Sequence, residues 1–319
     1  PFERDGASGA IDLVRALKAE VETQALPIVL NGVEPGRIGK AALDLGVDDV
    51  LPADTPIDEL DARLPRLVRA AVMQAELARR VETAAELGHR VDPAGFVRGY
   101  PLRPRVMTVS EDGTLLSDLQ QMLLMAGFHA IPERSAFRAG ERIDDERVDA
   151  AVIGLTQGGD VETAAALCAD IRSNPRLFNL PTLVVGAGID ADGRHRLYRA
   201  GAGIVIGRAP TTAPNDPLTT YLQMLVNRQR QRWTLRDPFK ATVAEATADS
   251  ELRGIYSERF LRAHLARQIA ALEARAEVLS LACLRIGNAG EVHDAHGQEA
   301  RHVLMQQMAD WLGGMTRIE

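Results

Sequence analysis

The side chains that could do chemistry in this sequence are concentrated in residues 279–298, LSLACLRIGNAGEVHDAHGQ. An apolar run from Leu279 to Ile286 is followed by a polar loop that contains Asp294. A carboxylate in such a place could help to bind Mg²⁺, which demands oxygen ligands and holds a triphosphate through them. The charged residue inside the apolar run is Arg285, however, and a guanidinium cannot ligate a cation. The segment therefore has the pattern of a catalytic stretch without its reactive groups.

This segment resembles the GGDEF domain of diguanylate cyclases, whose matching stretch follows the pattern D-x-D-x-F-K-x-x-N-D-x-x-G-H. When the two are aligned through Gly297, Asp294 keeps its place. Arg285 replaces the first aspartate of the pattern, and Gly287 replaces the second. The resemblance implies a fold signature from which the metal-binding carboxylates have been lost. We therefore expect no catalytic residues, no metal site, and nucleotide binding or scaffolding in place of turnover.

Two further stretches support the same resemblance. Residues 249–260, DSELRGIYSERF, are similar to the opening motif D-x-L-T-G-L-x-N-R-R-x-F and keep Leu252, Gly254 and Arg259. Arg317 falls on the arginine of the family's R-x-x-D motif, which binds cyclic di-GMP. An arginine fork suits that ligand because it bonds phosphate or guanine bidentately and stacks on the purine. The partner aspartate would be residue 320, so an ordinary surface arginine is an equal alternative for Arg317.

The elements that precede this region contain an internal repeat. One copy runs from Leu13 to Pro52, the other from Leu167 to Gly207, and each reads as helix, strand, helix, strand. Such alternation predicts a parallel sheet covered on both faces. The second copy also has an upstream half, with strands at 106–109 and 150–153 and a helix at 115–125 that Gly127 stops. The first copy lacks this half.

The repeats resemble the receiver domain of bacterial response regulators, present twice before the GGDEF-like region. The implied fold class is α/β: flavodoxin-like receivers with doubly wound parallel sheets, then the N-terminal part of an α+β, nucleotide-cyclase-like GGDEF domain. The length of 319 residues suits two to three domains at ~100 to 200 residues each. The expected parts are an N-terminally truncated first receiver with its long last helix (1–87), a linker (88–103), a second receiver (104–230), a linker (231–247) and a degenerate, C-terminally truncated GGDEF domain (248–319).

Receiver chemistry needs an acidic pair for Mg²⁺, an aspartate that accepts the phosphoryl group, a hydroxyl residue and a lysine. In the second receiver, Ser110 and Glu111 stand at the acidic pair, Gly154 at the acceptor and Arg208 at the lysine. In the first receiver, Gly32 occupies the hydroxyl position. We expect neither receiver to be phosphorylated, and both to serve as dimerisation and docking modules.

Composition excludes several classes of protein. The net charge of −7 and the pI of about 5.6 argue against DNA as a partner, because a basic surface is missing. Cys168 and Cys283 form neither a disulfide framework nor a zinc spacing, which suits a reducing cytoplasm. No apolar run approaches the ~18 residues of a transmembrane helix, so membrane insertion is not expected.

The sequence thus favours a catalytically inactive, two-component-type signalling protein in the cytoplasm. It would be a homodimer, dock a protein partner through its receivers, need no cofactor, and act as a cyclic di-GMP effector or scaffold. The alternative is a diguanylate cyclase that condenses two GTP molecules with Mg²⁺, with Asp294 holding guanine. Arg285 and Gly287 weigh against it, because no remaining side chain supplies metal-based charge stabilisation.

Overall fold

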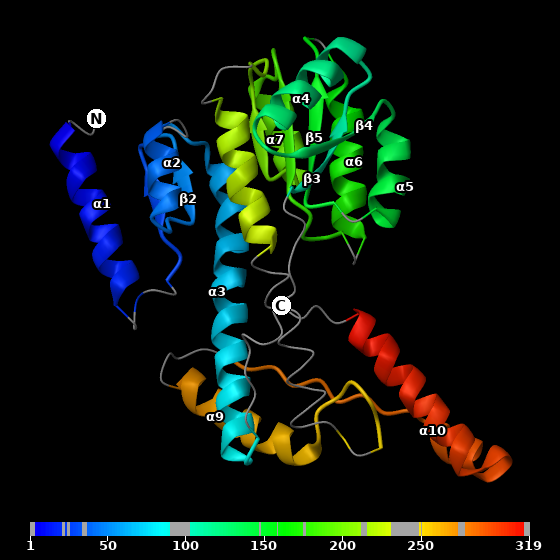
Figure 1. The fold of residues 1–319 in the computed structure, drawn as a ribbon. Coiled ribbons are helices and arrows are strands. Elements are labelled where there is room, and N and C mark those ends of the chain that lie inside the picture. Colours follow the sequence, from blue (N-terminus) through cyan, green and yellow to red (C-terminus); the bar gives the residue numbers. More distant parts are fainter. Residues whose placement is uncertain are drawn as a thin grey trace. The chain divides into compact units, whose positions relative to one another are not determined.

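The protein is described from a computed structural model (Figure 1). The structure describes residues 4–20, 23, 26–33, 37–89, 103–146, 148–157, 159–174, 177–211, 216–230, 249, 251–273 and 278–315. The chain forms two compact units. Unit 1 contains Pro1–Ala71 and Tyr100–Arg232, and unit 2 contains Val72–Gly99 and Trp233–Glu319. The predicted boundaries at 88–103 and 231–247 fall largely outside the described residues and stay predictions.

Unit 1 contains a five-stranded parallel sheet in the order β4-β3-β5-β6-β7. This is the 2-1-3-4-5 order of the flavodoxin-like doubly wound fold, which CheY also has. The predicted parallel, doubly covered sheet is therefore confirmed for the second repeat. The strands are β3 (Arg105–Val109), β4 (His129–Glu133), β5 (Ala150–Leu155), β6 (Thr182–Gly186) and β7 (Ile204–Ile206). The helices are α4 (Gly113–Met125), α5 (Ala136–Asp145), α6 (Val161–Ser173), α7 (Ala191–Arg199) and one over residues 217–230.

Helices cover both faces of this sheet. Helix α4 and the helix over 217–230 share one buried cluster with the sheet, and α5, α6 and α7 share the other. Strand β5 is consequently buried along nearly its whole length and reads as the unbroken apolar run AAVIGL. Helix starts are fixed by caps: the side chain of Asp112 accepts a hydrogen bond from the Leu115 N–H, and Asp190 accepts one from Gly193. Gly127 ends α4 with φ 87°, as predicted.

Strand β4 and helix α5 were missed by the sequence analysis. β4 lies at the edge of the sheet, and only Ile131 is fully buried among its residues. It also contains Pro132, which is tolerated at an edge because no neighbouring strand needs its N–H. An edge strand of this kind carries a weak sequence signal, since a single buried position gives no alternation to detect.

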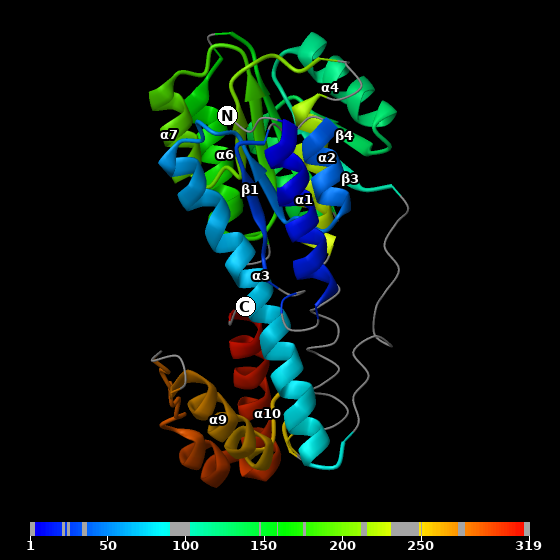
Figure 2. The same ribbon diagram turned by 90° about the vertical axis from the view of Figure 1, so that its left-hand side faces the viewer.

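The N-terminal part of unit 1 forms helix, strand, helix, strand, as predicted. Its strands β1 (Val29–Asn31) and β2 (Asp49–Leu51) pair in parallel as a separate two-stranded sheet. Figure 2 shows strand β1 together with the two helices of this part. The helices are α1 (Arg4–Ala19) and α2 (Arg37–Asp44), and the long helix α3 (Ile57–Glu86) follows them.

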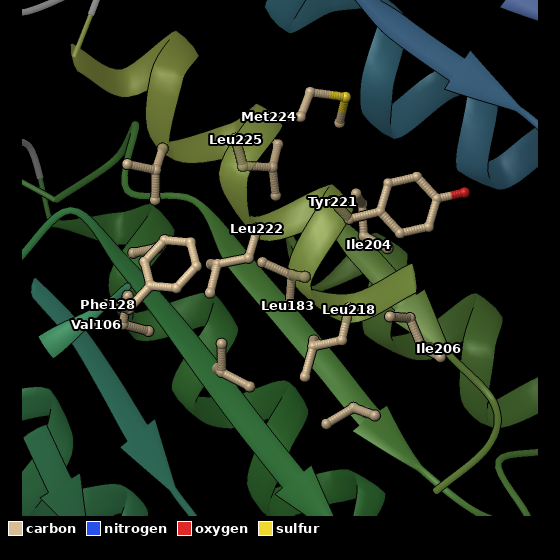
Figure 3. Close-up of a cluster of buried hydrophobic side chains, with 14 of the residues drawn as sticks. Val106, Phe128, Leu183, Ile204, Ile206, Leu218, Tyr221, Leu222, Met224 and Leu225 are labelled. Carbon is tan, nitrogen blue, oxygen red and sulfur yellow. The ribbon is translucent and has the colours of Figure 1, made fainter. Parts of the chain in front are cut away.

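The helix over residues 217–230 joins the two parts of unit 1. Figure 3 shows its residues Leu218 and Leu222 in the buried cluster with Leu183 of β6. The same cluster includes Val47 and Val50 from the N-terminal part. Because residues of both sheets and of this helix belong to one cluster, the core is continuous between the two sheets. Its burial stabilises the fold, since apolar surface removed from water contributes roughly 25 cal/mol per Å².

A buried charge cluster accompanies this core and consists of Asp49, Glu59, Arg63 and Arg228. Arg63 donates to both carboxylate oxygens of Asp49, at 3.0 Å and 2.5 Å, and to Glu59 at 2.5 Å. Arg228 lies 3.3 Å from Asp49. The side chains of Arg63 and Asp49 are 2% and 1% exposed. The cluster balances two cations with two anions, which is the condition for keeping charges away from water.

The protonation states in this cluster follow from its geometry. Burial alone lowers the pKa of Arg63, but Asp49 and Glu59 raise it above its usual value overall. The Arg63 guanidinium also lies 4.9 Å from the centroid of the Tyr221 ring. Burial raises the pKa of Tyr221 to about 12, although Arg63 opposes the shift. Arg63 is therefore a permanent cation held between carboxylates and an aromatic ring.

Unit 2 is helical in the part that the structure describes. It contains the second half of α3, helix α9 (Glu258–Glu273) and helix α10 (Ala289–Met315), which is kinked at Gly297, where φ is 85°. The apolar run at 279–286 is largely exposed and irregular. A single strand cannot satisfy its own backbone groups, and no described residue offers it a ladder partner. The α+β character expected for this region is thus not seen in the described residues.

No helix within the described ranges combines the length and the apolar character that crossing a membrane requires.

We predict that Asp49→Asn lowers the free energy of unfolding by about 3 to 5 kcal/mol, because Arg63 and Arg228 would share less negative charge in a buried site. Urea unfolding followed by circular dichroism measures the change. The matched control is Asp12→Asn: Asp12 pairs with Arg15 at 2.8 Å, but these side chains are 66% and 60% exposed. That change should cost at most about 1 kcal/mol. Equal losses of unfolding free energy in the two variants would show that the buried charge cluster stabilises the fold no more than an exposed ion pair does.

Candidate functional site

A pocket opens at the carboxyl ends of β3 and β5, where doubly wound sheets usually bind their ligands. It is the location that the sequence analysis assigned to the phosphoacceptor chemistry. Ser110, Glu111 and Gly154 all line it. The other lining residues are Val109, Asp112, Ala136, Ile153, Leu155, Thr156, Gly159, Asp160, Thr163 and Ala164.

The acceptor position in this pocket is closed by leucines. A Cβ atom added at Gly154 would lie 2.8 Å from Cδ1 of Leu119 and 3.1 Å from Cδ2 of Leu115, both on α4. Leu119 is completely buried. A side chain at this position would therefore require α4 or its leucines to move. An added Cβ would thus press on the ends of these two leucine side chains. Glycine also provides no carboxylate that could accept a phosphoryl group.

The polar residues that line the pocket also make structural hydrogen bonds. Ser110 is buried, and its N–H donates to the Glu133 carbonyl oxygen at 3.2 Å. Glu111 is exposed. Asp112 caps α4, and Asp160 caps α6 by accepting from the N–H of Glu162 at 2.9 Å. Hydrogen bonds from the side chain and the backbone of Thr163, followed by that Glu162 bond, lower the pKa of Asp160 although desolvation opposes them.

The sequence analysis missed Asp112 and Asp160. The signal for both was available, because an aspartate directly before an amphipathic helix is an N-cap candidate. Within the described ranges, no group of three or more His, Cys, Asp or Glu side chains could hold a metal ion. The pocket retains a carboxylate at two helix starts, but each one already serves its own helix.

In the second receiver, the resemblance places the hydroxyl residue at Gly186 or Ala187, and neither residue has a hydroxyl group. At Gly186, an added Cβ would lie 2.5 Å from the carbonyl oxygen of Leu155 on the neighbouring strand. Arg208 does not line the pocket. Its guanidinium contacts Asp216 at 3.1 Å, and Asp216 accepts from the Leu218 N–H at the start of the following helix. Arg208 therefore serves the start of the helix over 217–230.

The candidate residues of the GGDEF-like region are not brought together into a pocket by the described part of unit 2. Arg285 and Gly287 lie in the exposed irregular stretch before α10. Asp294 lies on the exposed surface of α10, in its first part. Among the described residues, neither the Arg285 nor the Asp294 side chain has a hydrogen-bond or ion-pair partner. Arg317 lies outside the described residues, so its expected ligand contact stays a prediction.

The opening motif of that region has a structural explanation. Asp249 accepts hydrogen bonds from the N–H groups of Glu251 at 2.8 Å and Leu252 at 3.0 Å, which forms a tight turn. Gly254 has φ 82°, a conformation that residues with a Cβ rarely adopt. Ser257 caps α9 by accepting from the Phe260 N–H at 3.3 Å. These residues shape the start of α9.

Gln306 fixes α10 to this turn and was not found by sequence reasoning. Its Oε1 accepts from the Arg253 N–H at 2.8 Å, and its Nε2 donates to the Arg253 carbonyl oxygen at 3.0 Å. A side-chain amide that pairs with both backbone groups of one residue leaves neither unsatisfied. No local pattern predicts such a pair, because the two residues are far apart in the sequence.

No protein-family model and no curated protein matches the chain. Among solved structures, it is similar to a response regulator from Chloroflexus aurantiacus, with 21% identity over 39% of this chain and 98% of that chain and a TM-score of 0.32. It is also similar to the signal receiver domain of an HD domain-containing protein from Pseudomonas fluorescens, with 18% identity, coverage of 43% and 96%, and a TM-score of 0.35. The fold assignment itself rests on the strand order of the five-stranded sheet.

We predict that Gly154→Ala destabilises unit 1 by about 1 to 3 kcal/mol, because the added methyl group overpacks Leu115 and Leu119. Chemical unfolding measures the loss. The matched control is Gly140→Ala on α5, where a Cβ would make only an ordinary 3.7 Å contact with Leu167. This control should stabilise the fold by about 0.5 to 1 kcal/mol, since alanine favours a helix interior. An unchanged free energy of unfolding in Gly154→Ala would mean that Leu115 and Leu119 leave room for a side chain at residue 154.

Proposed function

We propose that this chain is a signalling scaffold whose receiver-like domain works without phosphorylation. The observation that carries the proposal is the filling of the acceptor position at Gly154 by Leu115 and Leu119. A phosphoryl acceptor needs a carboxylate, a bound cation and space for three phosphoryl oxygens. In the described part of the pocket, the two capping aspartates Asp112 and Asp160 are already engaged with their helices.

The domain would then act by docking. In this proposal its surface binds a protein partner and a second copy of the chain in the cytoplasm, with no cofactor and no nucleic acid. The intact sheet and its covering helices support this, because they preserve a rigid surface although the chemistry of the pocket is gone. Docking surfaces require shape and exposed groups, and they do not require an acceptor side chain.

We predict that incubation with acetyl phosphate and Mg²⁺ leaves residues 104–230 without an acyl phosphate. Intact-mass measurement followed by peptide mapping checks this result. Gly154→Asp should also remain unmodified if it folds, because the leucines occupy the space and no lysine stands at 208. An aspartyl phosphate mapped to this region in the natural chain would contradict the proposal.

We further propose that unit 2 senses cyclic di-GMP through Arg317, with Asp294 as a second contact. The support is the sequence resemblance of residues 249–319 to the GGDEF domain, together with the chemistry of arginine toward phosphate and guanine. The alternative of a diguanylate cyclase finds no support in Arg285 and Gly287, which provide no carboxylate for Mg²⁺.

We predict that Arg317→Ala weakens cyclic di-GMP binding about tenfold or more, because a lost charge-assisted contact costs roughly 1.5 to 3 kcal/mol. Calorimetry on the whole chain measures the affinity. Arg301→Ala, an exposed arginine on α10, is the matched control and should bind normally. The same preparation with GTP and Mg²⁺ should form no cyclic di-GMP. Absence of binding by the natural chain would remove the ligand-sensing role, and product formation would restore the cyclase.

A further inference from the structure

The two repeats of unit 1 have the same structure where both are described. In the first repeat, α1, β1, α2 and β2 follow one another as α6, β6, α7 and β7 do in the second. Strand β1 pairs with β2 in the register that β6 has with β7: Val29 lies opposite Asp49, as Leu183 lies opposite Ile204. The second repeat therefore shows what surrounds each corresponding element of the first.

The two repeats differ at one edge of this shared ladder. Strand β6 pairs with β7 on one side and with β5 on the other. Within the described residues, β1 pairs with β2 alone. Every residue of β6 is buried, whereas Val29 and Leu30 of β1 are half-buried and Asn31 is exposed. The place that β5 takes beside β6 thus holds no strand beside β1 in the described structure.

The backbone groups on this edge of β1 follow from the hydrogen bonds on its other edge. The carbonyl oxygen of Ile28 accepts from the N–H groups of Asp48 at 2.8 Å and Asp49 at 3.2 Å, so it faces β2. Successive residues of a strand direct their backbone groups to opposite edges. Val29 and Asn31 therefore direct theirs away from β2, and we call these groups the open edge of β1. Such a row of groups is a template for another strand.

Two leucines of the first repeat are exposed although their counterparts in the second are buried. Leu13 on α1 is 60% exposed, and Leu26 before β1 is 52% exposed. The sequence repeat aligns them with Leu167 on α6 and Leu180 before β6, which are each 3% exposed. Both counterparts belong to the buried cluster that includes residues of β5. In the described structure, the first repeat therefore has an apolar surface without the cover that its counterpart has.

We propose that the open edge of β1 binds a parallel, uncharged apolar strand whose carboxyl end leads into α1. In the second repeat this place is taken by β5, which reads AAVIGL, contains no charged residue and leads into α6. Parallel neighbours need a crossover connection, and α1 stands before β1 in the chain as the crossover helix α6 stands before β6. The site is independent of the pocket and of the function proposed above.

A strand fits this place better than a helix or a second copy of β1. A helix offers few free backbone groups, because its N–H and carbonyl groups bond to one another along the helix. Two copies joined edge to edge would pair only the three residues of β1 with one another. Strand β5, in contrast, is six residues long and pairs with β6 from Thr182 to Gly186.

A chain that carries its own candidate strand tests the proposal. A copy of residues 149–154 (DAAVIG) is added directly before Pro1, so that residues 1–6 align with 155–160, which connect β5 to α6. Hydrogen exchange followed by NMR should show the Val29 and Asn31 amides protected about three- to tenfold more than in the natural chain, as for one hydrogen bond each. The Leu30 amide faces β2 and should change little.

The matched control is the same extension with its valine and its isoleucine both changed to aspartate. Charged side chains cannot be buried without partners on the faces of a sheet, so this extension should leave the exchange of the Val29 and Asn31 amides unchanged. Equal protection by the two extensions, or no protection by the apolar one, would overturn the proposal.

The natural chain provides a second test that needs no variant. At low protein concentration, the Val29 and Asn31 amides should exchange faster than the Leu30 amide, since only Leu30 faces β2. Equal protection of all three would show that the open edge is already covered, and would contradict the proposal. Protection of Val29 and Asn31 that grows with protein concentration would identify a second copy as the occupant, and would contradict it as well.

Discussion

The buried ion pair between Asp49 and Arg63 is the constraint on which the arrangement of unit 1 depends. A charge removed from water must have an oppositely charged partner in good geometry, or the fold is lost. Asp49 lies on β2, Arg63 on α3, and Arg228 on the helix over 217–230. Buried ion pairs therefore connect these three elements. Apolar packing alone would tolerate small shifts that the charges do not allow.

The stability of the five-stranded sheet does not depend on a phosphoryl acceptor. The sheet and its helices are stabilised by two large apolar clusters and by caps such as Asp112 and Asp160. None of these contributions needs an acceptor or a bound cation. Leu115 and Leu119 of α4 lie against Gly154.

In the described part of unit 2, α9 contacts α3 through polar side chains: His264 with Glu76, and Arg267 with Glu82. Helix α3 carries charged contacts in both units, since Arg63 lies in one and Glu76 in the other. In unit 1 these contacts accompany two large apolar clusters, whereas the described apolar clusters of unit 2 are small.

The sequence by itself determined the alternating helices and strands, the parallel sheet and the stop at Gly127, because periodicity and turn chemistry are local. The resemblance to a receiver domain assigned Ser110, Glu111 and Gly154 to one site, and all three line one pocket of the structure. Sequence reasoning missed the edge strand β4, because a strand with a single buried position shows no alternation of apolar and polar residues. Only the tertiary structure decided that leucines fill the pocket, that Asp49 meets Arg63 and that His264 meets Glu76. Such contacts join residues distant in sequence, and their strength depends on burial, which no local pattern contains.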